Sequence, residues 1–299
     1  MPYRPLGKSN LLVSNISMGC MSLEPDFKSF ENVINLAIDS GINFFDTADL
    51  YDKGINETLL GKSLGHKRQE VILATKVGNQ WNEAGTAWNW NPSKKYISSA
   101  IEASLQRLKT DYIDLYQLHG GTLDDPIDET IEAFEILKEQ GKIREYGISS
   151  IRPNVIREYL NRSNIVSIMM QYSLLDRRPE EACLDLIRNH DVSIITRGTL
   201  AKGLLCGKPA KPYLDHSAEA VAKASRVVER IAVNEKDTPS RIACRYVLQS
   251  DVIASAVIGF RTAEQVKSIL DGGNLSKLDK NDYESLMRSV PAKTYQNHR

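Results

Sequence analysis

The chain has 299 residues, of which 41% are hydrophobic and 25% charged, as in an ordinary soluble globular protein. Its 38 basic and 38 acidic side chains cancel, so no charge excess points to a nucleic acid or an anionic membrane. The sequence contains no apolar run of about 18 residues, so no membrane span is predicted. The opening segment 1–5 lacks the apolar core of a signal peptide. We expect no membrane or nucleic-acid function and a cytoplasmic location.

The cysteines and histidines are dispersed along the chain. The four cysteines contain no CxxC pair, so reduced, structural thiols of a cytosolic protein are expected. The five histidines show no HExxH spacing and no cluster of metal ligands. No metal site is therefore predicted.

Strand patterns alternate with amphipathic helix patterns along the whole chain. A Gly-Lys-Ser-Asn turn predicts an N-terminal β-hairpin within residues 2–15. The eight strand candidates that follow are 13–18, 43–45, 71–76, 112–118, 145–148, 166–170, 192–196 and 254–258. Helix patterns with apolar residues at i, i+3 and i+4 fill the intervals. Ser29 is the expected N-cap of the first helix, and Asp125-Pro126 are the expected N-cap and first residue of the helix after strand 112–118. A last helix at 279–288 leads into a polar tail.

This alternation predicts an α/β fold. Most consecutive strands start roughly 20–40 residues apart, as expected for βα units, and the longer interval before 254–258 holds two helix patterns. No linker or change in composition divides the chain, so residues 1–299 are expected to form one (β/α)8 TIM barrel domain. A doubly wound sheet is the alternative, and it is disfavoured because no GxGxxG motif follows the first strand.

Residues 78–92 interrupt the alternation. The segment contains all three tryptophans and shows no periodicity. A long structureless loop in a compact domain usually has a function, and exposed tryptophans are unfavourable unless they line a pocket or an interface. A pocket wall is favoured, and packing over the barrel rim is the alternative. The residues predicted to line the substrate pocket are Met21, Trp81 and Trp88, with Trp90, Tyr116 and the segment 206–216 as further candidates.

Three neighbouring strand candidates end on ionisable side chains. Asp46 follows the apolar strand 43–45, and Tyr51 lies just beyond it. Lys76 and His119 end the next two strands. An acid at the tip of a buried strand is costly to desolvate unless it is paired. Because all strands of a parallel barrel open on one face, these four residues could meet there.

Together the four side chains suit proton donation to a carbonyl oxygen. An ammonium group beside a phenol favours the phenolate and makes the phenol a better acid. Asp46 can hold Lys76 charged and in place, and His119 can hydrogen-bond the same substrate oxygen. No nucleophile is activated by a base, which argues against acyl transfer. Hydride from a nicotinamide is the natural complement to the donated proton.

Other interpretations stay open at this point. Lys76 could be the nucleophile of a Schiff-base lyase, although an adjacent Asp46 would hinder the deprotonation that this chemistry needs. The fold could also hold a nicotinamide cofactor as a sensor or regulatory subunit. Each of the four residues could by itself be structural, and their coincidence at corresponding strand exits is what favours a site.

The motifs around these residues resemble the signature of the aldo-keto reductase superfamily, of the bacterial NADPH-dependent type. They lie at 45–51, 74–76, 111–119, 147–149, 171–173 and 203–205, and from 259 onward. The resemblance covers nearly the whole chain and implies an alcohol:NADP+ oxidoreductase on a barrel without a Rossmann fold. It implies Tyr51 as general acid, Lys76 and Asp46 as its tuning pair, and His119 as the residue that orients the carbonyl.

The resemblance also implies a cofactor that lies extended across the barrel mouth. Ser149 and Gln171 correspond to family contacts with the nicotinamide. Ser150 stands where many members have a longer Asn, so that contact is expected to be weakened or water-mediated. The residues expected to bind the cofactor are Gly19, Ser149, Ser150, Gln171, Arg197, Gly198, Leu200, Gly203, Gly259, Phe260, Arg261 and Gln265.

Two arginines bear on how the cofactor is held. Many family members have an aromatic residue that stacks on the nicotinamide where this chain has Arg197. Its planar guanidinium could replace that ring or contact the pyrophosphate, and an exposed or salt-bridged arginine is the alternative. Arg261 precedes a helix start, where free N–H groups favour anions, and its charge suits a 2′-phosphate. Thr262 and Gln265 fit a capping box there. NADPH is expected over NADH, with a small-molecule, apolar or aromatic carbonyl compound as substrate.

Overall fold

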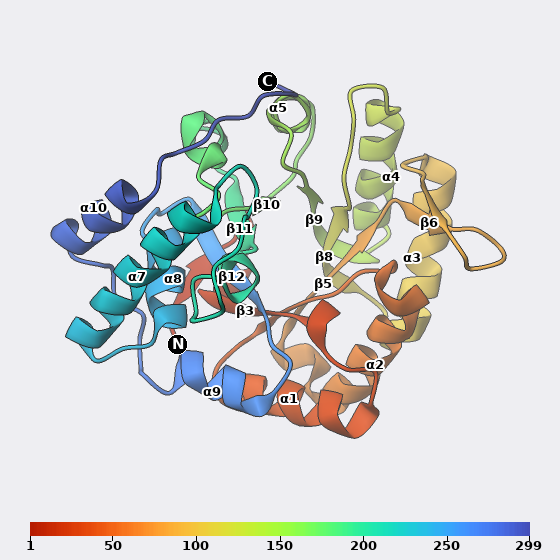
Figure 1. Ribbon diagram of the computed structural model, residues 1–299. Helices are drawn as coiled ribbons and strands as arrows, with labels where there is room; N and C mark the ends of the chain where they lie inside the picture. The colour runs from red at the N-terminus through yellow and green to blue at the C-terminus, as the bar shows by residue number, and fades with distance from the viewer.

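The computed structural model describes residues 1–299. Eight parallel strands form a closed barrel in the order β10-β11-β12-β3-β4-β5-β8-β9 (Figure 1). They are β3 Ile16–Gly19, β4 Phe44–Asp46, β5 Ile72–Val77, β8 Ile113–Leu118, β9 Ile143–Ser149, β10 Ser167–Gln171, β11 Ser193–Arg197 and β12 Ile253–Gly259. The predicted (β/α)8 barrel is confirmed, and the doubly wound sheet is excluded.

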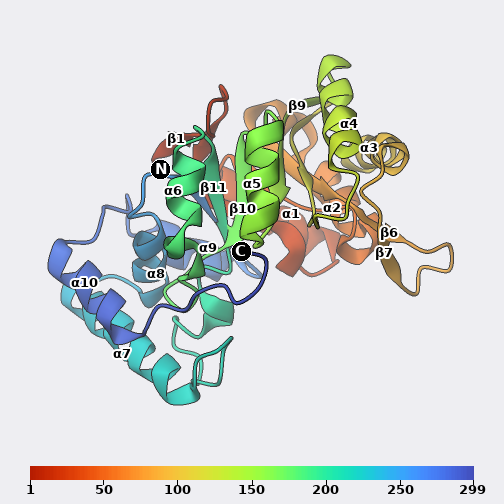
Figure 2. The ribbon, with the colours of Figure 1, turned by 90° about the horizontal axis from the view of Figure 1, so that it is seen from above.

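Helices surround the strands (Figures 1 and 2). They are α1 Phe27–Asp39, α2 Ile55–Leu64, α3 Lys94–Leu108, α4 Ile127–Glu139, α5 Pro153–Arg162, α6 Cys183–Arg188, α7 Ala218–Glu235, α8 Pro239–Val247, α9 Ala263–Leu270 and α10 Lys280–Ser289. Most begin with a side-chain cap, such as Ser93 accepting from Tyr96 N before α3 and Thr262 accepting from Gln265 N before α9. None is long and apolar enough to cross a bilayer.

The buried residues form two clusters because successive strand side chains point to opposite faces of the barrel. Phe45 belongs to the larger cluster, between strands and helices. Its neighbour Phe44 belongs to the smaller one, which also holds Leu115 and Ile195. Leu6 from the N-terminal segment is buried in this second cluster. The interior of the barrel is thus a packed core.

The predicted N-terminal hairpin is present. Strand β1 Tyr3–Pro5 pairs antiparallel with β2 Leu12–Ser14. Its Arg4 guanidinium donates hydrogen bonds to the carbonyl oxygens of Leu248, Ser250 and Ile253. The hairpin is therefore tied to the segment between α8 and β12, at the amino-terminal end of the barrel.

The expectation of a structureless segment at 78–92 is wrong. Strand β6 Asn79–Trp81 pairs antiparallel with β7 Trp88–Trp90, and Trp81 stands opposite Trp88. The Asn82 side chain closes the connecting turn by accepting from Thr86 N at 2.9 Å. Figure 2 shows this hairpin projecting from the barrel. Each strand is only three residues long, so alternation over such a stretch was too short to be recognised in the sequence.

Two predicted helix starts also differ. Asp26, and not Ser29, caps α1, because the Asp26 carboxylate accepts from Ser29 N at 2.9 Å. The Asp125-Pro126 pair does not cap α4 in the expected way. Pro126 occupies the cap position, and the Asp125 carboxylate instead accepts from Thr122 and Trp90. Asp125 thereby links a loop at the barrel mouth to the hairpin.

Candidate active site

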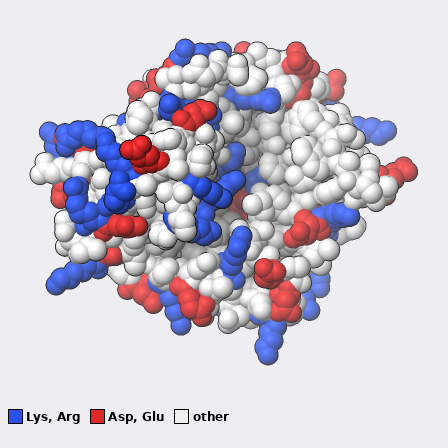
Figure 3. All heavy atoms as spheres, viewed as in Figure 1, with Lys and Arg blue, Asp and Glu red and all other residues white.

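A cavity of about 750 Å³ lies over the carboxyl ends of the strands. Six strand ends contribute to its wall, through Gly19, Asp46, His119, Ser149, Arg197 and Gly259. Figure 3 shows a hollow in this face with lysine and arginine atoms along one side. Because every barrel strand runs in the same direction, side chains distant in sequence converge here.

Lys76 lies at the end of β5 below this cavity, and only 1% of its side chain is exposed. Its Nζ donates to Asp46 Oδ2 at 2.6 Å, to Thr47 O at 2.8 Å and to Tyr51 Oη at 3.3 Å. An ammonium group has three N–H donors, so all of them are used. Gln117 Nε2 donates to the other Asp46 oxygen at 3.2 Å. The Asp46–Lys76 pair is thus hydrogen-bonded on both sides.

The charge on Lys76 is stabilised inside the protein. Burial alone lowers the pKa of the ammonium group, but the Asp46 carboxylate and the Tyr51 hydroxyl raise it, so the net pKa of Lys76 lies above its ordinary value. A Schiff-base lysine must be deprotonated to attack a carbonyl. The geometry therefore argues against Lys76 as a nucleophile.

Tyr51 is held at the cavity by a constrained turn. Three consecutive residues after it, Asp52, Lys53 and Gly54, have left-handed φ angles of 47°, 55° and 86°. Such conformations are costly for residues other than glycine and occur often at functional sites. The Tyr51 ring meets the His119 ring edge to face, with the centroids 5.9 Å apart. The phenol hydroxyl is thus directed at Lys76 while the ring is fixed against an imidazole.

His119 is neutral at physiological pH. Burial, reinforced by the charges of Lys76 and Arg197, lowers the pKa of its imidazole to about 3. Its Nδ1 is buried without a hydrogen-bond partner in the protein. A neutral imidazole has one donor and one acceptor nitrogen, so His119 can offer a hydrogen bond at the cavity without carrying a charge.

A buried polar network holds Thr75, the residue before Lys76, and the sequence analysis did not predict this network. Glu57 is fully buried in the first turn of α2. It accepts from Thr75 Oγ1 at 2.6 Å, from Ser104 Oγ at 3.3 Å and from Arg107 Nε at 2.7 Å. The network joins α2, α3 and the residue before Lys76. Its partners are far from Glu57 along the chain, so no local pattern pointed to it.

Of the twelve residues expected at the cofactor, six line the cavity: Gly19, Ser149, Ser150, Arg197, Gly198 and Gly259. The other six, which lie outside its wall, are Gln171, Leu200, Gly203, Phe260, Arg261 and Gln265. Gln171 nevertheless contacts the wall, because its Oε1 accepts from Arg197 Nη1 at 2.9 Å. Phe260 is buried, whereas Arg261 and Gln265 are exposed at the start of α9.

Arg197 is exposed and donates to an amide, not to a carboxylate. At α9, Gln265 Oε1 accepts from Arg261 N at 2.8 Å, so the capping interaction uses one of the free N–H groups. The Arg261 guanidinium is left exposed beside the remaining donors. Two arginines are therefore available to an anionic ligand at this end of the barrel.

Only some of the residues predicted for the substrate pocket line the cavity. Met21 and Trp88 line the cavity and are 62% and 50% exposed. Trp81 does not line it, because its Nε1 donates to Leu50 O at 3.3 Å and its ring lies under Lys53. Trp90 also lines the cavity, whereas Tyr116 and the segment 206–216 lie outside its wall.

Trp90 is anchored on both sides. Its Nε1 donates to Asp125 Oδ1 at 2.9 Å. A Cβ atom at Gly78 would lie 2.5 Å from the indole ring, and one at Gly120 would lie 3.2 Å from it. Both glycines therefore leave the space that the ring occupies. Arg152, which was absent from the sequence predictions, lines the same wall and donates to Gly121 O at 2.6 Å.

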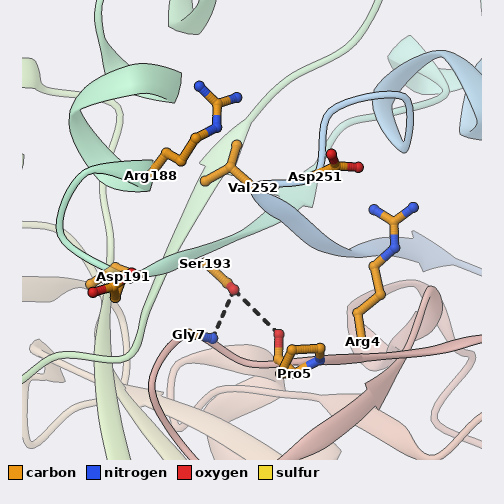
Figure 4. Close-up of a pocket in the computed structure, with 9 residues that line it drawn as sticks. Arg4, Pro5, Gly7, Arg188, Asp191, Ser193, Asp251 and Val252 are labelled. Carbon is orange, nitrogen blue, oxygen red and sulfur yellow. Dashed lines mark hydrogen bonds between the residues drawn. The ribbon is translucent and has the colours of Figure 1, made fainter.

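A second cavity, of about 490 Å³, lies at the opposite end, where the N-terminal hairpin meets the barrel (Figure 4). Ser193 Oγ accepts there from Gly7 N at 2.7 Å and donates to Pro5 O at 3.3 Å. Arg4 is likewise committed to backbone carbonyls. These groups hold the hairpin in place, so we assign this cavity a structural role.

The fold and the site define a class of protein, and the comparisons agree with it. The model of the Aldo/keto reductase family matches residues 15–290, and the chain belongs to this family. The family carries out NAD(P)H-dependent reduction of carbonyl compounds, so the protein is an oxidoreductase that acts on small molecules.

Particular relatives cover the whole chain. The aldo-keto reductase AKR11C1 from Bacillus halodurans, in its holo form, has a TM-score of 0.94 and 48% identity, over 100% of this chain and 99% of that chain. The oxidoreductase YqkF of Bacillus subtilis is 46% identical over 100% of both chains. The NADH-specific methylglyoxal reductase of Escherichia coli is 29% identical over 96% of this chain and 97% of its own.

Proposed function

We propose that the protein reduces an aldehyde or ketone with hydride from NADPH, and that Tyr51 donates the proton to the carbonyl oxygen. The observation that carries the proposal is the buried Lys76 Nζ, which binds Asp46 and Tyr51 Oη at the floor of the cavity. A cation held there stabilises negative charge on the phenol oxygen as the proton leaves. Asp46 keeps that cation in place.

His119 orients the carbonyl in this proposal. Its neutral imidazole lies against the Tyr51 ring and can donate a hydrogen bond to the oxygen that Tyr51 protonates. Two donors on one oxygen polarise the carbonyl and stabilise the charge that develops on it. Trp88 and Trp90 of the hairpin and Met21 supply an apolar wall for the rest of the substrate.

The cavity suits a nicotinamide dinucleotide. When bound, this cofactor supplies the hydride to the carbonyl carbon. Ser149 and Gln171 present polar groups for a carboxamide, and Arg197 lies beside them with a planar, charged face. The exposed Arg261 and the start of α9 fit a 2′-phosphate, which favours NADPH.

The test is the loss of NADPH absorbance with a panel of aldehydes, for wild type and Tyr51→Phe. The phenylalanine keeps the ring against His119 but removes the acid, so kcat should fall by about 10²–10⁴ while NADPH still binds. Tyr3→Phe, at the far end of the barrel, is the matched control and should retain wild-type turnover.

The same assay with NADH tests the cofactor preference, and wild-type kcat/KM should be higher with NADPH. Equal values would contradict the role assigned to Arg261. Binding of NADPH without turnover in wild type would favour the sensor interpretation. If neither cofactor bound, the proposed function would be wrong.

A further inference from the structure

The side-chain amide of Gln171, at the end of β10, is bound at both of its ends. Its Oε1 accepts from Arg197 Nη1 at 2.9 Å, and its Nε2 donates to Asp176 Oδ2 at 2.9 Å. A Cβ atom at Gly198 would lie 3.2 Å from Gln171 Cγ, so the side chain lies directly against the wall of the cavity.

These two partners fix which end of the amide faces which way. A carboxylate can only accept hydrogen bonds, and a guanidinium can only donate them. Rotating the amide by half a turn would set oxygen against oxygen at Asp176 and N–H against N–H at Arg197. The Gln171 oxygen is therefore held toward Arg197 and the cavity. Its second lone pair stays available to an N–H donor there.

Asp176 is itself held firmly. Arg178 binds its carboxylate in a bidentate manner: Nε donates to Oδ1 and Nη2 donates to Oδ2, each at 2.7 Å. Only 1% of the Asp176 side chain is exposed. Asp176 and Ser173 also exchange both backbone hydrogen bonds, at 3.0 and 3.2 Å. The carboxylate thus has one orientation, and it transmits that orientation to Gln171.

The C-terminal tail covers the far side of this arrangement. The guanidinium of Arg178 lies 5.1 Å from the centre of the Tyr295 ring, and Tyr295 is buried. Tyr295 N donates to Glu181 Oε2 at 3.2 Å, and the carbonyl of His298 accepts from Asn154 N at 2.9 Å. Figures 1 and 2 both show the C-terminus beside α5.

We propose that Asp176, Arg178 and Tyr295 are positioning residues that set the Gln171 amide for the nicotinamide end of the cofactor. The carboxamide N–H of a nicotinamide is a donor that the fixed Gln171 oxygen can accept. The proposal rests on the proposed function, in which Gln171 contacts that carboxamide. It assigns the tail a role at a site that the tail does not touch.

The experiment compares two ligands by titration calorimetry: NADP+, and 2′-phospho-ADP-ribose, which lacks the nicotinamide. Asp176→Asn removes the acceptor-only partner of the amide, so only the exposed Arg197 is left to orient Gln171. The Kd of NADP+ should rise about tenfold, as expected when one hydrogen bond is misdirected. The Kd of 2′-phospho-ADP-ribose should stay unchanged, which a general loss of structure would not allow.

Graded variants test the outer positions. Arg178→Lys keeps the charge but loses the bidentate contact with Asp176, so the Kd of NADP+ should rise less than in Asp176→Asn. Tyr295→Ala removes the ring over Arg178 and should weaken NADP+ binding, whereas Tyr295→Phe should not, because the Tyr295 hydroxyl has no hydrogen-bond partner. Asp185→Asn, at an exposed acid on α6, is the matched control and should bind both ligands like wild type.

The positioning role would be overturned if Asp176→Asn weakened the binding of both ligands equally, or if it weakened the binding of neither. Gln171→Ala separates this failure from failure of the proposed function. If Gln171→Ala weakens NADP+ but Asp176→Asn does not, only the positioning role is wrong. If Gln171→Ala has no effect, the proposed cofactor contact is wrong as well. If Asp176→Asn does not fold, Arg178→Lys and Tyr295→Ala decide the question with the same ligand pair.

Discussion

His119 packs, partly buried, against Tyr51 at the end of β8, and its environment keeps the imidazole uncharged. The cause is the loss of water around the ring together with two cations, Lys76 and Arg197. The same side chain in the unfolded protein has an ordinary pKa of about 6.5. This difference connects a property of the site to the stability of the whole protein.

We predict that His119 makes the protein less stable as the pH falls. Between pH 6.5 and 3 the unfolded chain binds a proton at His119 that the folded chain does not, so the free energy of unfolding decreases as the pH falls through this window. The contribution is at most about 1.4 kcal/mol per pH unit. Urea unfolding between about pH 7 and 4 should show a shallower decline for His119→Asn than for wild type.

His66→Asn, at an exposed histidine, is the control and should follow the wild-type decline. If His119→Asn does so too, the imidazole is not held neutral in the folded state. That result would also remove the basis for His119 as an uncharged donor to the substrate.

Single residues were predictable where they marked the end of a strand. Asp46, Lys76 and His119 each interrupt an apolar run, and the parallel barrel brings such interruptions to one face. Glu57 and Asp176 do not end an apolar run. The sequence alone does not distinguish such a buried acid from an exposed one, because its partners are not known. Arg107, the partner of Glu57, is brought to it by packing between elements. Arg178 lies two residues from Asp176, but that spacing alone does not distinguish a buried ion pair from an exposed one.

At the scale of elements, the β6–β7 hairpin shows how a wall of the cavity is built. Trp90 is set between Asp125, which binds its indole N–H, and two glycines that leave room for its ring. Both glycines, Gly78 and Gly120, have left-handed φ angles, of +124° and +156°. The sequence predicted a pocket wall at 78–92 but not the hairpin that forms it.

We predict that Gly78→Ala displaces Trp90. The new methyl group would lie 2.5 Å from the indole ring, in a backbone conformation that alanine rarely adopts. The expected loss of stability is about 1–3 kcal/mol, from strain and overpacking together. Urea unfolding measures this loss, and the ratio of kcat/KM for a bulky and a small aldehyde reports on the wall.

Gly85→Ala is the matched control in the same hairpin. It also has a left-handed φ, of +64°, but its new methyl group would meet only the end of the Lys53 side chain, at 3.3 Å. It should lose stability through the backbone alone and leave the substrate ratio unchanged. If both variants behave alike, the contact of Gly78 with Trp90 has no consequence for the wall.

At the scale of the whole molecule, the two ends of the barrel have different roles. The carboxyl ends of the strands hold the candidate active site, whereas the amino ends are closed by the N-terminal hairpin through Arg4. The barrel itself followed from the sequence because eight strand patterns alternate with helices without a break. The path of the C-terminal tail did not, since its polar sequence shows no periodicity from which contacts could be read.

We predict that Arg4→Gln destabilises the protein without changing catalysis. The variant loses donors to three backbone carbonyls, so the free energy of unfolding should fall by about 1–3 kcal/mol. Its kcat should equal that of wild type, because Arg4 lies at the opposite end from Tyr51. Urea unfolding and the NADPH assay measure the two quantities on one preparation.

Arg188→Gln, in the same cavity as Arg4, serves as the control. The Arg188 side chain is 48% exposed and pairs with an exposed Asp185, so its loss should be nearly neutral. A fall in kcat for Arg4→Gln would show that the hairpin is coupled to the active site, contrary to the division of roles described above.

The order of the strands also separates two tasks along the chain. The proposed proton-donating residues come from β4, β5 and β8 and the turn after β4, all within 46–119. The proposed cofactor contacts at Ser149, Gln171, Arg197 and Arg261 all lie from residue 149 onward, and only Gly19 on β3 precedes the proton-donating residues. A gene built this way can exchange its later half and acquire a new cofactor preference while it inherits the same acid. Cofactor choice and reaction chemistry can therefore evolve, or be recombined in the laboratory, as separate modules.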